Sequence, residues 1–116
     1  MLSYRATFDT LRSMTAASLD TNYAIVGAAS LYPIVAVKFT NLTNGDVVIS
    51  LDGTNDMIYV ASNSFTLYDL RTNAAFNTDF MLPVGTPFLA KDGATIATTG
   101  TFYIETLIAK QILGGS

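Results

Sequence analysis

The 116-residue chain contains no cysteine, no histidine and no tryptophan. Without cysteine it can form neither disulfides nor thiolate metal sites. Without histidine it lacks the usual general base near neutral pH and the commonest transition-metal ligand. No glycine-rich phosphate loop and no aspartic-protease triplet is present that would supply another chemistry. We therefore expect a protein that is not an enzyme, with no catalytic residue and no cofactor.

Charged residues are also scarce, at 13 % of the chain against an average of ~25 % for soluble domains. The six lysines and arginines are spread from Arg5 to Lys110, so no basic cluster for direct nucleic-acid binding is present. Hydrophobic residues make up 50 % of the sequence. A surface with so few charges is covered either by threonine, serine and asparagine or by partner chains, and we favour partner chains.

Long apolar runs are missing as well, since no segment approaches the ~18 residues that a membrane span requires. The first residues, Met1 to Arg5, lack the basic and then apolar pattern of a signal peptide. We therefore expect no membrane association and folding in a cytoplasm, which leaves open a later exit inside a larger particle.

Short segments rich in β-branched and aromatic residues recur between turn residues, which is the pattern of an all-β domain. We expect strands at residues 4–8, 22–26, 33–40, 47–51, 57–60, 64–70, 88–91 and 101–109. Residues 10–19 are ambiguous, and we favour a loop between two strands over one short helix. The chain length suits one domain, so we predict a single antiparallel β-sandwich or jelly-roll-like domain over residues 1–116, with about eight short strands and a frayed tail at 113–116.

The period-two alternation of strands predicts which side chains share a face. Thr66 and Tyr68 are expected toward the surface. The Asn44-Gly45 pair predicts a tight hairpin turn after residues 33–40, because both central positions of that turn favour positive φ. The expected inward residues are Val35, Val37, Ile49, Phe39, Phe65, Leu67, Phe102, Ile104 and Ile108.

Apolar residues also occur on the opposite faces of these strands, at Ile34, Ala36 and Val48. Both sheet faces are therefore expected to be partly covered. We predict a homo-oligomer or a specific complex with another protein. The candidate interface residues are Ile34, Val48, Tyr68 and Tyr103.

The segment from Asp52 to Asp56, together with Asp46, carries several oxygen ligands of the kind that Ca²⁺ prefers. Asp52 and Asp56 are the weak metal candidates. The segment lacks the EF-hand spacing and its twelfth-position glutamate, and aspartate, glycine and asparagine are also the residues that β-turns favour. We therefore favour a simple turn and no metal.

Aromatic side chains are a second candidate feature, because sugar-binding sandwiches present exposed rings. The candidate rings are Tyr32, Tyr59, Tyr68 and Tyr103. The absence of tryptophan and the usual role of strand aromatics in packing make carbohydrate binding the alternative hypothesis.

Several segments, taken in order, resemble small β-sandwich structural proteins of tailed bacteriophages. They are SYRATFDTLR at 3–12, YAIVG at 23–27, FTNLT at 39–43, VISLDG at 48–53, SFTLYDL at 64–70 and VGT at 84–86. The resemblance implies a virion subunit that folds in the host cytoplasm and assembles with itself and other virion proteins. Its expected position is the head–tail junction or neck, the tail, or the capsid surface as a decoration protein. No catalytic residue is implied.

Overall fold

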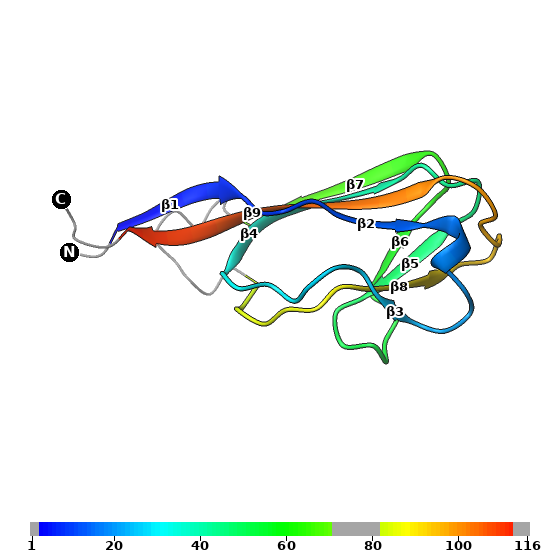
Figure 1. Cartoon of the computed structure of the whole chain (residues 1–116), viewed down its shortest axis with the longest axis horizontal. Coiled ribbons are helices and arrows are strands. Elements are labelled where there is room, and N and C mark those ends of the chain that lie inside the picture. The colour runs from blue at the N-terminus through cyan, green and yellow to red at the C-terminus, as the bar shows by residue number, and fades with distance from the viewer. Residues whose placement is uncertain (1–2, 71–81, 113–116) are drawn as a thin grey trace.

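The computed structural model describes residues 3–70 and 82–112, and the expected frayed tail at 113–116 lies outside this part (Figure 1). The described residues form nine strands and one 3₁₀ turn, η1, at Ala16–Ser18. The strands are β1 (Ser3–Phe8), β2 (Arg12–Thr15), β3 (Ala24–Ile25), β4 (Ile34–Asn41), β5 (Val47–Ser50), β6 (Ile58–Val60), β7 (Ser64–Asp69), β8 (Leu89–Asp92) and β9 (Thr101–Ile112). The predicted all-β class is confirmed.

The strands form two antiparallel sheets packed against each other (Figure 1). Sheet A has the order β1-β9-β4-β7, with β2 also paired to β9, and sheet B has the order β3-β8-β5-β6. β1 pairs with the second half of β9 and β2 with the first half, so together they make one interrupted edge strand. The fold is therefore an antiparallel β-sandwich, as predicted.

The order of pairing also defines how the chain is wound. With β1 and β2 counted as one strand, the first strand pairs with the last, β3 with β8, β4 with β7, and β5 with β6. This nested pairing is that of a long antiparallel ribbon rolled into two sheets, which is the jelly-roll arrangement.

The core lies between the two sheets and centres on three phenylalanines from β4, β9 and the segment before β8. The Phe39 ring stacks on Phe102 at 6.5 Å and meets Phe88 edge-on at 6.0 Å. The predicted inward row of β9, made of Phe102, Ile104 and Ile108, is confirmed because all three are buried. Burial of these side chains on one face of each sheet supplies the main stabilisation of the sandwich.

The start of β4 differs from the simple alternation. The pairing of β4 with β9 shifts register between Ile34 and Ala36, which marks a β-bulge. Ile34 therefore joins the core cluster opposite Ile108 and is 0 % exposed, and Val35, which was expected inward, is also buried at 2 %. The expectation that Ile34 is an interface residue is wrong for this reason.

The segment after β4 is not the predicted hairpin, because β4 and β5 lie in different sheets. Gly45 lacks a positive φ. Instead, a Cβ at Gly45 would overlap the backbone of Ala97, so glycine permits a close approach of two chain segments. The Asn44 side chain completes this contact by accepting the N–H groups of Thr98 and Thr99.

Residues 10–19, expected as a loop, contain the strand β2 and the turn η1. No α-helix occurs in this stretch, all of which is described. At the other end of the same edge, β1 and the last residues of β9 form a two-stranded ribbon that extends beyond the rest of the sandwich (Figure 1).

Candidate functional site

Large exposed apolar side chains collect on the face of sheet A that is turned away from sheet B, which we call the outer face. Phe65 and Leu67 on β7 are 62 % and 59 % exposed, and Phe8 on β1 is 77 % exposed. The expectation that Phe65 and Leu67 point inward is therefore wrong. Tyr68, on the opposite side of β7, meets the buried Phe39 ring edge-on at 6.3 Å, which identifies the core side of this strand.

Strand register shows which residues of the outer face are neighbours. Lys38 on β4 lies opposite Leu67 on one side and Glu105 of β9 on the other. Leu107 lies opposite both Phe8 and Ala36. A shallow groove of about 220 Å³ follows these positions and is lined by Phe8, Ala36, Val37, Lys38, Leu67, Asp69, Glu105, Thr106 and Leu107.

Lys38 and Glu105, the two charges on the central strands of this face, do not neutralise each other. The Lys38 ammonium lies 4.6 Å from the centre of the Phe65 ring, a cation–π contact. Among the ion pairs of the described residues, none joins Lys38 to Glu105, although the two residues are opposite each other in register. The outer face therefore combines exposed apolar groups with three charged residues, Lys38, Asp69 and Glu105, of which Lys38 and Glu105 do not pair with each other.

A neighbouring polar atom on this face is incompletely satisfied. The Thr40 hydroxyl is buried and has no hydrogen-bond partner within the described part of the chain. Thr40 lies opposite Phe65 on β7 and Tyr103 on β9, and these neighbours flank it on both sides. Leaving a buried hydroxyl unpaired costs free energy.

The remaining interface candidates are not on one surface. Tyr103 is half-buried on the outer face of sheet A, opposite Thr40. Val48 is half-buried on sheet B, opposite Tyr59 and Lys91. Tyr68 lines a separate apolar groove of about 270 Å³ between the edges of the two sheets, together with Val37, Phe39, Leu51, Met57, Ile58, Leu70 and Leu82.

The four candidate sugar-binding rings are likewise distributed. Tyr59 lies on sheet B, and Tyr103 lies on the outer face of sheet A. Tyr68 lies in the groove between the sheets, and Tyr32 lies under the Lys110 ammonium at 5.3 Å. These positions do not form a common stacking platform.

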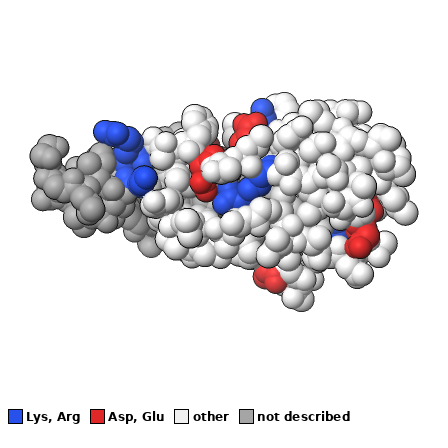
Figure 2. All heavy atoms as spheres, viewed as in Figure 1, with Lys and Arg blue, Asp and Glu red and all other residues white. Residues whose placement is uncertain are grey.

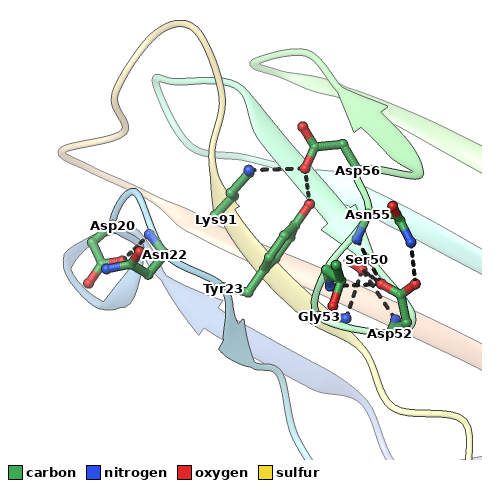
Figure 3. Close-up of polar contacts among 10 residues, drawn as sticks. Asp20, Asn22, Tyr23, Ser50, Asp52, Gly53, Asn55, Asp56 and Lys91 are labelled. Carbon is green, nitrogen blue, oxygen red and sulfur yellow. Dashed lines mark hydrogen bonds and ion pairs between the residues drawn. The ribbon is translucent and has the colours of Figure 1, made fainter.

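The Asp52 carboxylate closes its own turn (Figure 3). It accepts the backbone N–H groups of Thr54 and Asn55 at 2.8 and 2.9 Å and the Asn55 side-chain amide at 2.7 Å. The Ser50 hydroxyl also donates to it at 2.8 Å. The Asn55 and Thr54 N–H groups hold the pKa of Asp52 well below its usual range.

Asp56 belongs to a different cluster, which joins three segments of sheet B (Figure 3). It accepts the Tyr23 hydroxyl and forms a 2.9 Å ion pair with the Lys91 ammonium, which also lies 4.6 Å from the centre of the Tyr23 ring. Burial, followed by the bond to Asp56, raises the pKa of Tyr23 to about 12. Sequence reasoning could not identify this cluster, because its members are distant in the chain.

Asp52 and Asp56, the two metal candidates, thus bind different neighbouring groups and do not share a site. Asp46, the third acid considered with them, accepts the Ser62 N–H at 3.1 Å, and a hydrogen bond from Tyr59 lowers its pKa. Residues 3–70 and 82–112 contain no group of three or more acidic side chains placed to hold a metal ion.

Arg12 is a buried charge that the sequence reasoning missed. Its guanidinium donates to the Ala28 carbonyl at 3.0 Å and the Thr106 hydroxyl at 3.1 Å, and pairs with Asp9 at 3.2 Å. It also lies 5.3 Å from the centre of the Phe88 ring. With these partners Arg12 ties β2 to the loop after β3 and to β9, which is a structural role.

No helix in the described ranges has the length and apolar character needed to cross a membrane. No protein-family model, curated protein or solved structure matches the chain. Because the comparisons indicate no site, the candidate functional site is chosen from the geometry alone. It is the outer face of sheet A, where large apolar side chains are exposed.

Proposed function

We propose that this chain is a non-enzymatic structural subunit of a tailed-bacteriophage virion and that it acts by assembling with other protein chains. Its place is the head–tail junction or neck, the tail or the capsid surface. The protein folds in the host cytoplasm before it enters the particle. Its partners are copies of itself and other virion proteins, with no direct role for nucleic acid or membrane.

The observation that carries the proposal is the outer face of sheet A, where Phe8, Phe65 and Leu67 expose more than half of their surface. Contiguous exposed apolar side chains on a soluble domain mark interaction surfaces. Figure 2 views the sandwich from the side and shows charged side chains in a few separate places on a largely uncharged surface. Enrichment in phenylalanine is a feature of interface cores.

The fold gives weaker support by analogy. Jelly rolls are used in viral capsid proteins and also in lectins, and a fold alone does not define a function. The ordered segments that resemble tailed-phage structural proteins favour the first of these two classes. The scattered tyrosines are a reason to place carbohydrate binding second.

The direct test is to purify particles of the phage that encodes this chain and to measure its copy number by quantitative mass spectrometry. Variants supplied during infection then probe the surface. We expect Phe65→Ser and Leu67→Ser to reduce incorporation at least tenfold. Leu31→Ser, at a 77 % exposed position outside the strands, is the matched control and should be incorporated normally.

Particles that lack the chain would refute the proposal. Normal incorporation of both variants would show that the outer face is not the assembly surface. If the pure protein is also retained on immobilised glycans and Tyr59→Ala abolishes that retention, the carbohydrate-binding hypothesis replaces the assembly hypothesis.

A further inference from the structure

The two central charges on the outer face of sheet A, Lys38 and Glu105, form a self-complementary pair. Lys38 and Glu105 are in direct cross-strand register on β4 and β9, the two central strands of the sheet. They do not form an ion pair within the chain. Each charge is therefore available to an opposite charge brought from outside.

We propose that a second copy of this chain covers this face, in a two-fold dimer whose axis runs parallel to β4 and β9 and midway between them. Rotation about such an axis lays β4 of one copy over β9 of the other. Lys38 then meets Glu105 of the second copy, and Glu105 meets its Lys38, so two ion pairs form from one surface. The inference rests on the proposed assembly function and names one of its partners.

The same rotation matches the apolar groups. β7 moves over the β1–β2 edge of the second copy, since these are the two outer positions of sheet A. Ala36 is thereby brought over Leu107 of the second copy, because the two residues share one register line. Asp69 and Phe8 lie at the two ends of that line and come opposite each other, with Leu67 two residues from Asp69 along β7. On the two central strands, Ala36 thus faces Leu107 and Lys38 faces Glu105, in the reciprocal manner of an isologous contact.

A second copy fits these features better than an unrelated protein does. A partner of another sequence would need a negative and a positive group at the same spacing and between apolar flanks. This chain already carries that pattern. The face is small, because four strands about 4.8 Å apart and about seven residues long project about 450 Å². A standard complex buries ~800 Å² per partner, so the proposed dimer is at the small end of specific interfaces.

The test is a charge exchange in the full chain, measured by analytical ultracentrifugation. We expect the unchanged protein to be a dimer, and Lys38→Glu and Glu105→Lys each to raise the dimer dissociation constant at least tenfold through like-charge contact. The double variant K38E/E105K restores opposite charges and should recover the dimer. The double variant also lacks the contact between Lys38 and Phe65. If it dimerises, the dimer depends on the ion pairs and not on that contact.

Lys110→Glu is the matched control for Lys38→Glu, because it makes the same change in net charge at a residue that contacts Tyr32. It should leave the dissociation constant unchanged. Thermal melting by circular dichroism should confirm that every variant is folded. Increasing salt should weaken the unchanged dimer, because the ion pairs are screened.

A monomeric unchanged protein would overturn the inference, as would single variants that dimerise normally or a double variant that stays monomeric. These results are separate from the particle test. A monomer in solution that is incorporated into particles refutes the dimer and leaves the virion proposal standing. A dimer that obeys the charge exchange but is absent from particles refutes the virion proposal alone.

Discussion

Two asparagines three positions apart, Asn41 and Asn44, provide a test of how burial affects the contribution of a side-chain hydrogen bond to the free energy of unfolding. Asn41, at the end of β4, is fully buried and uses its whole amide. It donates to the carbonyls of Gly45 and Val60 at 2.8 and 2.9 Å and accepts the N–H and hydroxyl of Thr43 at 2.9 and 2.6 Å. These bonds fix the crossover from sheet A to sheet B.

Asn41→Ala removes a partner from the Thr43 N–H and from the Val60 carbonyl, while the Gly45 carbonyl keeps the Thr43 hydroxyl. A buried polar group that loses its partner costs ~1–3 kcal/mol, so we expect a loss of about 2–6 kcal/mol in the free energy of unfolding. This is a large share of the ~5–15 kcal/mol that stabilises a typical domain.

Asn44→Ala is the control, because Asn44 makes three comparable bonds to Thr98 and Thr99 but is exposed. Water replaces those partners, so we expect a loss of about 1 kcal/mol or less. Both variants are measured by urea denaturation followed by circular dichroism and tyrosine fluorescence at one protein concentration. Equal losses, or a larger loss for Asn44→Ala, would refute the argument from burial.

Three further predictions concern the core, a tyrosine and a glycine. Ile104→Ala should cost about 2–5 kcal/mol because it opens a core cavity. Leu67→Ala, introduced into a charge-reversed variant that is monomeric, should change the free energy of unfolding by about 1 kcal/mol or less. Equal costs for Ile104→Ala and Leu67→Ala in urea denaturation would contradict the assigned strand faces. Tyr23 should form phenolate only near pH 12, and Asp56→Ala should lower that pKa toward 10 in a spectrophotometric titration. Since the folded pKa is raised, the associated stability is complete below pH 10 and is lost as pH rises toward 12. Gly45→Ala should lower the melting temperature, because its Cβ would overlap the neighbouring backbone.

The sequence was informative about the class of fold and the position of most strands. Alternation of β-branched and aromatic residues is a local signal, and the expected strand at residues 33–40 corresponds closely to β4 at Ile34–Asn41. The inward row of β9 was also predicted correctly. The bulge that takes Ile34 into the core has no local signal in this segment, so its burial was missed.

The orientation of β7 shows the limit of the period-two rule. The rule groups Phe65 with Leu67 and Thr66 with Tyr68, but it does not say which group faces the core. Choosing the more apolar pair for the interior is the usual assumption, and it fails here. In this chain the apolar pair belongs to the candidate assembly surface.

Long-range contacts explain the other misses. The Asn44-Gly45 pair has the signature of a hairpin, yet the rolled topology sends β4 and β5 to different sheets. The contact of Asp56 with Tyr23 and Lys91 likewise joins residues 33 and 35 positions apart. Neither pairing is encoded in the neighbouring residues, so neither could be derived from short sequence patterns.

The apolar character of both faces of sheet A also bears on how the chain assembles. A two-layer sandwich covers only one face of each sheet, so the outer face of sheet A is exposed in the isolated chain. Exposed apolar residues on β7, an edge strand, would favour uncontrolled association. A head-to-tail contact through this face would leave it open to further chains, whereas a two-fold contact uses the same face of both copies and closes. The proposed pairing of Lys38 with Glu105 of the second copy selects the closed arrangement, and the edges of the sandwich remain available for contacts with other virion proteins.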